Sequence, residues 1–254
     1  MRKLDYQKII SEIQEWIKEY VISAKVKGVV VGISGGIDSA VTTTLCVKAL
    51  GKKNVIGLGL PCSSIPQDLN DANKLAKILG IKFIILELTN TYNEFLKNSS
   101  SLFESNKLAT ANLKPRLRMM AIYFTGQSLG KFLVAGTSNR TEIAIGYFTK
   151  YGDGGVDIEP IGGLYKCEVR ESAKKLNIPK EIINKPPSAG LWEDQTDEDE
   201  IGLTYNVLDE IIFRIDNDLD LNDLNQDNVK KVKEMMKSAH HKLTMPPTFR
   251  IKNN

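Results

Sequence analysis

Residues 28–39 read Gly-Val-Val-Val-Gly-Ile-Ser-Gly-Gly-Ile-Asp-Ser, and this stretch decides the fold. The β-branched run at 28–33 predicts a buried strand, and a helix is expected at 40–50. A glycine-rich turn between a strand and a helix favours phosphate binding, because backbone N–H groups there point at an anion. Asp38 would repel a bare phosphate, so it indicates a bridging Mg²⁺. The alternative is a plain glycine turn in which Asp38 or Ser39 caps the helix.

The alternation of strand and helix continues along the first half of the chain. Strands are expected at 54–60, 81–88 and 131–135, and helices at 4–20, 68–79 and 112–129. Such alternation builds right-handed βαβ units, so we predict an α/β fold with a Rossmann-like parallel sheet and helices on both faces. A long glycine-rich loop at 146–163 then precedes helices at 166–176, 200–213 and 228–239. No internal repeat or low-complexity linker interrupts the chain, so residues 1–254 are expected to form a single domain.

Composition limits the kinds of binding partner and the cellular compartment that we expect for the protein. The 254 residues are 42% hydrophobic, enough for one large buried core, and the formal net charge of +3 is too balanced to indicate a nucleic-acid partner. No stretch approaches the roughly 20 apolar residues of a membrane helix, and the first 20 residues lack a signal-peptide cleavage site. The three cysteines form no CxxC pair, so neither a disulfide framework nor a zinc site is expected. We predict a cytoplasmic protein with no membrane association.

The turn Ser34-Gly-Gly-Ile-Asp-Ser39 resembles the SGGxDS loop of the N-type ATP pyrophosphatases, which grips the pyrophosphate released when ATP adenylates a substrate. Five further stretches resemble motifs of the ammonia-dependent NAD synthetases in that group, and they follow in the same order. They are Asn-Leu-Lys-Pro-Arg-Leu-Arg-Met at 112–119, Gly-Thr-Ser-Asn-Arg-Thr-Glu at 136–142, Gly-Tyr-Phe-Thr-Lys-Tyr-Gly-Asp-Gly-Gly-Val-Asp at 146–157, Lys-Pro-Pro-Ser-Ala at 185–189 and His-Lys-Leu-Thr-Met-Pro-Pro at 241–247. The resemblance therefore covers nearly the whole chain, and it implies the adenine nucleotide alpha hydrolase-like form of the sheet.

The resemblance also implies a reaction. Family members use ATP and Mg²⁺ to amidate nicotinic acid adenine dinucleotide (deamido-NAD) to NAD through an adenylated carboxylate, the final step of NAD biosynthesis, with release of AMP and pyrophosphate. Glutamine-dependent relatives carry a separate amidase domain, and the synthetase motifs here leave no residues for one. Free ammonia is thus the expected nitrogen donor. Family members are usually homodimers that bind the dinucleotide near the subunit contact, and a homodimer is expected here.

The resemblance assigns site residues in three groups. The ATP-binding group is Gly32, Ile33, Ser34, Gly35, Gly36, Ile37, Asp38, Ser39, Thr137, Lys166 and Ser188. Asp38 and Glu142 would be the metal ligands, since Mg²⁺ prefers hard oxygen atoms. The residues that would bind deamido-NAD are Arg116, Lys150, Asp157, His241 and Lys242. Lys166 would act catalytically on the ATP phosphates, and Asp153 is the candidate for orienting ammonia or accepting its proton.

Each assignment has a plainer alternative. Glu142 could be a solvated helix residue, and Asp153 could only form a turn. Arg116 and Arg118 could be surface charges on a long helix. The histidines at 240–241 could belong to an exposed tail.

The reaction has alternatives as well. A tRNA-thiolating pyrophosphatase should show a cysteine pair and a basic extension, and neither is visible. The pyrophosphatase half of GMP synthetase would lack the matches at 146–157 and 241–247. A non-catalytic adenine-nucleotide-binding module would not need Asp38 and Glu142 together with Lys166.

Overall fold

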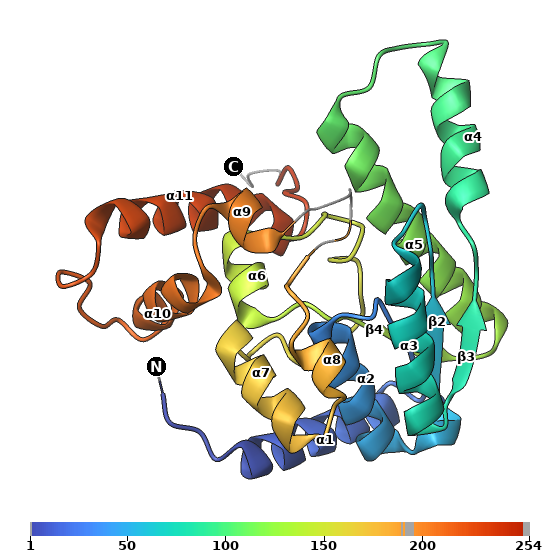
Figure 1. The fold of residues 1–254 in the computed structure, drawn as a ribbon, viewed down its shortest axis with the longest axis horizontal. Coiled ribbons are helices and arrows are strands. Elements are labelled where there is room, and N and C mark those ends of the chain that lie inside the picture. The colour runs from blue at the N-terminus through green and yellow to red at the C-terminus, as the bar shows by residue number, and fades with distance from the viewer. Residues whose placement is uncertain (1, 189, 191–195, 251–254) are drawn as a thin grey trace.

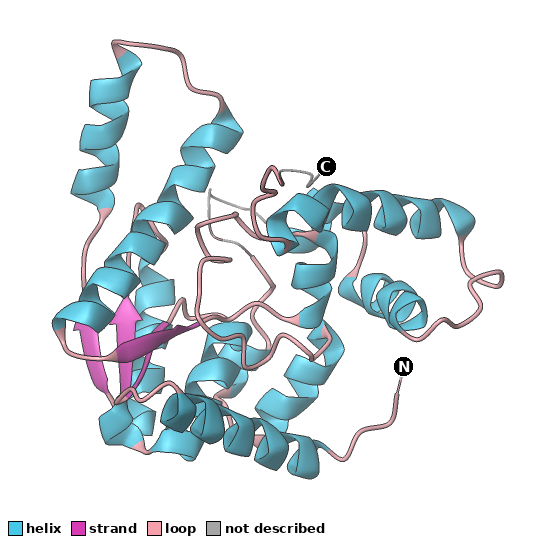
Figure 2. Cartoon of the chain, turned by 180° about the vertical axis from the view of Figure 1, so that it is seen from behind, coloured by secondary structure: helices cyan, strands magenta, loops and turns pink. Residues whose placement is uncertain are grey.

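The computed structural model describes residues 2–188, 190 and 196–250. Its centre is a four-stranded parallel sheet with the strand order β3-β2-β1-β4 (Figures 1 and 2). The strands are β1 (Gly28–Gly32), β2 (Val55–Gly59), β3 (Lys82–Ile85) and β4 (Phe132–Ala135). In the middle of the sheet Val30 of β1 pairs with Ile56 on one side and with Val134 on the other. The predicted Rossmann-like α/β fold is confirmed.

Helices cover both faces of the sheet (Figure 2). The side chains of β1 alternate between the two faces and so belong to two different cores. Val29 and Val31 belong to a core shared with α1 (Tyr6–Ser23), α2 (Ile37–Leu50), α3 (Pro66–Leu79), α7 (Lys166–Lys175) and α8 (Lys180–Ile183). Val30 belongs to a second core shared with α4 (Thr89–Ser100) and α5 (Lys107–Ser128). Full burial of a valine side chain contributes roughly 1.5–3 kcal/mol, so covering both faces explains the unbroken apolar run at 28–33.

Four C-terminal helices form a third core beside the sheet (Figure 1). They are α6 (Arg140–Ile145), α9 (Asp197–Ile201), α10 (Tyr205–Asp216) and α11 (Gln226–Leu243). Tyr205 and Leu208 of α10 are fully buried there. Arg140 pairs with Asp216 and joins α6 to α10, with a distance of 2.8 Å from Arg140 Nε to Asp216 Oδ2. This core holds the segments that follow β4 against the carboxyl end of the sheet.

The structure departs from the sequence expectations at several helices, among them α8, for which no element was predicted. The single helix expected at 200–213 is wrong, because Gly202 adopts a left-handed φ of +68° that ends α9 before α10 begins. No element was predicted at α4, whose sequence is rich in Asn, Ser and Thr and which packs through Tyr92. The last helix continues to Leu243, so the histidines at 240–241 are helical, and both are exposed as the plainer alternative expected.

Candidate active site

The loop between β1 and α2 has the geometry of a phosphate-binding turn. Gly35 lies at φ +81°, and a Cβ there would stand 2.4 Å from the carbonyl oxygen of Asp68, so only glycine fits. Ser34 Oγ accepts the N–H of Gly36 at 3.2 Å, and Ser39 Oγ donates to the carbonyl of Gly36 at 3.0 Å. Gly36 is the N-cap of α2 and supplies no side-chain acceptor. The first-turn N–H groups of α2 therefore remain for an anion.

Three charged side chains from three helices meet beside this loop. Lys166 Nζ of α7 lies 2.7 Å from Asp38 Oδ2 of α2 and 3.1 Å from Glu142 Oε1 of α6. The Lys166 side chain is only 2% exposed, against 18% for Asp38 and 14% for Glu142. Solvation as a free helix residue is thus the wrong description of Glu142. The structure brings the residues assigned to the metal and the phosphates into one cluster.

The cluster carries excess negative charge. Burial raises the pKa of Glu142 to about 7; the ammonium of Lys166 opposes the shift, and the carboxylates of Asp38 and Asp197 add to it. Burial alone would lower the pKa of Lys166, but Asp38 and Glu142 raise it above its ordinary value, so its ammonium stays charged. The cluster thus contains one ammonium group and three carboxyl groups, those of Asp38, Glu142 and Asp197. An additional cation would be stabilised here.

Two residues that the sequence analysis missed hold this cluster in place. Asn139 Nδ2 donates to Asp38 Oδ1 at 2.9 Å, and Asn139 forms a capping box with Glu142 at the start of α6. Asp209 of α10 accepts the N–H of Cys167 at 2.8 Å and that of Lys166 at 3.3 Å. The Asn-x-x-Glu spacing could have revealed the capping box. Nothing local distinguishes Asp209 from other acids in α10, because its partners lie more than forty residues away.

Glu159 shapes the loop that carries Thr137. Its Oε2 accepts the N–H of Ser138 at 3.1 Å, and burial raises the pKa of Glu159 to about 8. A Cβ on Gly136 would stand 2.4 Å from the Glu159 carboxylate, so the loop follows that side chain closely. Thr137, half-buried, lies between Gly136 and Ser138 after β4.

A second group of predicted residues gathers where loop 146–163 meets α11. Lys242 Nζ donates to the carbonyls of Gly146 and Phe148, at 2.7 Å in each case. Lys150 Nζ donates to the carbonyl of His241. Lys150, His241 and Lys242, all assigned to the dinucleotide, thus lie together.

Asp153 lies in the same loop, and its Oδ1 accepts the N–H of Thr149 at 3.0 Å. Crowding by the surrounding protein raises the pKa of Asp153, although the residue keeps an exposed surface. A raised pKa makes the carboxylate a stronger base than an ordinary aspartate. The bond to Thr149 is also what a turn-forming aspartate makes, so a turn role and a catalytic role are both compatible with this geometry.

Asp157 and Ser188, which were also assigned to the site, have their hydrogen-bond partners outside the loop between β1 and α2. Asp157 joins β4 to α5, since its carboxylate accepts the N–H of Val134 at 2.8 Å and the hydroxyl of Tyr123 at 3.0 Å. Ser188 is exposed and accepts the N–H of Gly190 at 3.1 Å. Ala189 of the predicted 185–189 motif lies outside the described residues.

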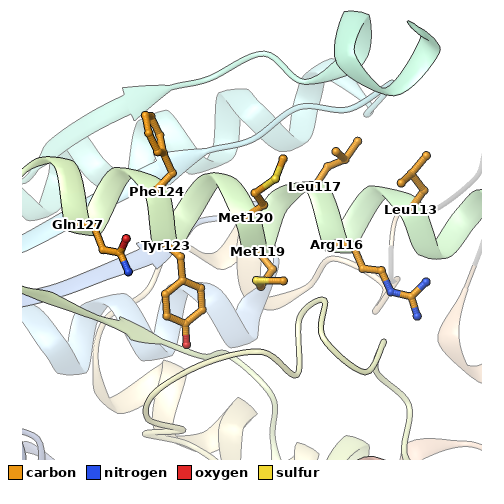
Figure 3. A pocket seen from close by; sticks show the side chains of 8 residues that line it. All are labelled: Leu113, Arg116, Leu117, Met119, Met120, Tyr123, Phe124 and Gln127. Atoms are coloured by element: carbon orange, nitrogen blue, oxygen red, sulfur yellow. The ribbon is translucent and has the colours of Figure 1, made fainter. Parts of the chain in front are cut away.

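The two arginines of α5 differ. Arg118 Nε donates to the carbonyl of Leu60 at 3.0 Å, and Nη2 donates to Ser64 Oγ at 3.1 Å, so it holds the loop after β2. A surface charge is the wrong description of Arg118. Arg116 is exposed and lines a groove of about 510 Å³ on α5, between apolar side chains (Figure 3). The groove is also lined by Leu113, Leu117, Met119, Met120, Tyr123, Phe124 and Gln127.

Among residues 2–188, 190 and 196–250, no three His, Cys, Asp or Glu side chains are placed to hold a metal by themselves. In the same part of the chain, no helix is both long enough and apolar enough to cross a membrane.

A glycine loop after β1 and an acidic cluster with a buried lysine at the carboxyl end of a parallel sheet define a nucleotide-binding α/β protein. The chain belongs to the NAD synthase family, whose model matches residues 9–246. It is 44% identical to the NH(3)-dependent NAD(+) synthetase of Finegoldia magna over 97% of each chain. Among solved structures it is similar to the NMN synthetase from Francisella tularensis, with a TM-score of 0.89, 34% identity and coverage of 98% and 100%. It is also similar to the NH3-dependent NAD synthetase from Campylobacter jejuni in complex with the nitrate ion, with a TM-score of 0.83, 32% identity and coverage of 97% and 100%.

Proposed function

We propose that this protein is a ligase that amidates deamido-NAD to NAD with ATP and ammonia. The observation that carries the proposal is the contact of Lys166 with Asp38 and Glu142 beside the phosphate loop. Family membership and 42–44% identity to relatives named NH(3)-dependent NAD(+) synthetase support this reaction over tRNA thiolation or simple nucleotide binding.

The first step activates the substrate carboxylate, which ammonia cannot attack productively because oxide is too poor a leaving group. A carboxylate oxygen attacks the α-phosphorus of ATP, and the bond from that phosphorus to the β-bridging oxygen breaks as pyrophosphate leaves. The first-turn N–H groups of α2 and the ammonium of Lys166 face the charge that grows on pyrophosphate. A donor or cation fixed in that position before the reaction typically contributes about 3–4 kcal/mol to such a barrier.

The second step forms the amide. Neutral ammonia attacks the carbonyl carbon of the adenylate, the bond from that carbon to the AMP oxygen breaks, and the nitrogen loses one proton. Asp153 is the proposed acceptor of that proton, which its raised pKa supports. Its position beside Lys150 and Lys242, the residues proposed to bind the dinucleotide, is consistent with this role.

Mg²⁺ fits the donor set. Asp38 and Glu142 offer hard oxygen atoms from separate helices, and the cluster has more carboxyl groups than cations. Mg²⁺ typically takes one or two carboxylates and completes its shell with waters and substrate phosphates, so the lack of a third acidic ligand does not count against it. Bound there, Mg²⁺ would neutralise charge on the ATP phosphates.

The dinucleotide is proposed to bind between loop 146–163 and α11, near Lys150, His241 and Lys242, and to reach Arg116 and Asp157 on the side of α5. A second candidate substrate is nicotinic acid mononucleotide, because the chain is also similar in structure to the NMN synthetase from Francisella tularensis. The two acids share the reacting carboxylate and differ in whether an adenylate follows.

A homodimer is proposed, with the α4–α5 hairpin in the contact. The hairpin projects from the body of the molecule (Figures 1 and 2), and it exposes Leu102, Phe103 and Phe124 by 78, 59 and 70%. Large exposed apolar surfaces of this kind mark protein contacts. Sedimentation equilibrium should report a dimer for the protein and a shift toward monomer for Phe124→Glu, and a wild-type monomer at micromolar concentration would contradict this.

One assay tests the proposed reaction. The purified protein receives ATP, Mg²⁺ and either deamido-NAD or nicotinic acid mononucleotide, with ammonium or glutamine as the nitrogen source. NAD formed from deamido-NAD with ammonium but not with glutamine, and with equimolar AMP and pyrophosphate, is the expected result. Preferential amidation of the mononucleotide would select the second candidate, and no amide under any condition would reject the ligase.

A cytoplasmic location remains a prediction from the cysteine content.

A further inference from the structure

Asp197 is a buried acid next to the cluster, and the proposed chemistry gives it no task. It is 4% exposed and begins α9. Its Oδ2 accepts the hydroxyl of Tyr205 at 2.8 Å, and its Oδ1 accepts that of Tyr147 at 3.2 Å. Its backbone N–H donates to the carbonyl of Pro187 at 3.1 Å, and this bond fixes the position of the Asp197 backbone. The hydroxyl of Tyr147 lies nearer to Glu200, at 2.7 Å, so the short bond from Tyr205 is the one that orients the Asp197 carboxylate.

The hydroxyl of Tyr205 stands between two carboxylates. It lies 2.8 Å from Asp197 Oδ2 and 3.3 Å from Glu142 Oε1, and the ring is fully buried with Lys166 Nζ 4.7 Å from its centroid. A phenol has one proton and can donate it fully to one acceptor. The shorter bond to a carboxylate is the stronger one, so the proton of Tyr205 goes to Asp197.

This choice matters for Glu142. Each carboxylate oxygen has two lone pairs, and Lys166 already occupies one of those on Glu142 Oε1, so a hydroxyl proton directed at the other competes there with a cation. Because Asp197 takes the proton of Tyr205, Glu142 Oε1 keeps its lone pairs for Lys166 and for a divalent cation.

We propose that Asp197 is a positioning residue that draws the hydroxyl proton of Tyr205 away from Glu142 and so keeps Glu142 free to bind a divalent cation. The proposal rests on the metal site of the proposed function. Removing Asp197 also removes one carboxyl group from the cluster, a loss that Asp197→Leu and Asp197→Asn share. The part of the effect that runs through Tyr205 is therefore the difference between these two variants, and it should disappear when the Tyr205 hydroxyl is removed.

The substitution Asp197→Leu tests this without leaving either hydroxyl unpaired. Tyr147 also donates to Glu200 at 2.7 Å, and Tyr205 can turn to Glu142. Replacing a buried carboxylate by an apolar side chain of similar size is tolerated when its partners find other acceptors. Asp197→Asn is the conservative control, because the amide oxygen can still accept the proton of Tyr205.

The readout is binding of Mn²⁺, measured by electron paramagnetic resonance in the presence of ATP and without the carboxylate substrate. Relative to wild type, Asp197→Leu should bind Mn²⁺ about 10-fold more weakly, in the range typical for loss of a residue that orients a metal ligand. Asp197→Asn should lie between the two. Tyr205→Phe should bind within about threefold of wild type, and adding Tyr205→Phe to Asp197→Leu should restore binding to about the level of Asp197→Asn.

Recovery in the double variant separates the proposed role from a structural one, in which the two losses would accumulate. Wild-type affinity in Asp197→Leu, or a double variant as weak as Asp197→Leu, would overturn the proposal. Glu142→Gln gives the reference for loss of the ligand itself. If wild type and Glu142→Gln bound Mn²⁺–ATP equally, the proposed metal site would fail, and the role of Asp197 with it.

Discussion

At the scale of single residues, Lys166 is the side chain whose charge the proposed site depends on most. Its buried ammonium touches two carboxylates that come from helices far apart in the chain. Asp38 and Glu142 lie in recognisable stretches of the sequence, whereas Lys166 lies outside the quoted motifs and was assigned through the family resemblance alone. The sequence could not identify Asn139, Asp197 and Tyr205 as their partners, since those contacts exist only once α6, α9 and α10 have packed together.

Replacing Lys166 by methionine should therefore reduce kcat. The side chain keeps its length but loses the charge that faces the leaving pyrophosphate, so we expect a fall of about 100- to 1000-fold. The control is Lys174→Met in the same helix, whose side chain is 58% exposed and pairs with Glu171 in α7. Steady-state kinetics with saturating ATP would check this, and a change of kcat of less than about fivefold in Lys166→Met would contradict the assigned role.

At the scale of elements, the order of strands and helices follows from periodicity and from glycine positions, and it was predicted for most of the chain. The break between α9 and α10 was missed because Glu200–Phe213 has helical periodicity throughout, and a glycine inside such a pattern is usually tolerated. α4 was missed because its polar composition carries a weak signal and its stability comes from packing on α5. The role of Arg118 was missed for a similar reason, since its partners lie in the loop after β2.

Arg118 and Arg116 give a matched pair on α5. Arg118→Leu should lower the free energy of unfolding by about 1–3 kcal/mol, because Leu60 and Ser64 lose their donors. Arg116→Leu should change it by less than about 0.5 kcal/mol, because Arg116 is exposed. Urea unfolding followed by circular dichroism measures both, and equal effects of the two substitutions would show that Arg118 does not hold the loop.

At the scale of the whole molecule, the C-terminal helices must stay docked on the sheet for the site to exist. Asp216 contributes to this docking through Arg140 of α6 and the hydroxyl of Tyr165. Burial alone would raise the pKa of Asp216, but the hydrogen bonds from Arg140 and Tyr165 lower it below its ordinary value. Because the folded-state pKa is lowered, this stabilisation is present above the unfolded pKa of about 3.9 and is lost as the pH falls through the folded value.

Asp216→Asn should thus destabilise the protein at neutral pH and matter less in acid. The expected loss at pH 7 is about 1–3 kcal/mol, since charge-assisted bonds become neutral ones. As the pH falls below the unfolded pKa of about 3.9 and through the lower folded value, the difference between variant and wild type should shrink, because wild-type Asp216 becomes protonated. Urea unfolding at several pH values measures this, and a difference that grows toward low pH would contradict it.

In the proposed reaction, this site joins the substrate carboxylate to the α-phosphorus of ATP before ammonia attacks. Deamido-NAD labelled with ¹⁸O in both carboxylate oxygens, incubated with the protein, ATP, Mg²⁺ and ammonium, tests it most directly. Mass spectrometry should find one ¹⁸O in each AMP released and none in pyrophosphate, because the oxygen that attacks phosphorus stays on it when the amide forms. Label in inorganic phosphate, with ADP as the other product, would mean that the terminal phosphate activates the substrate and would contradict the account.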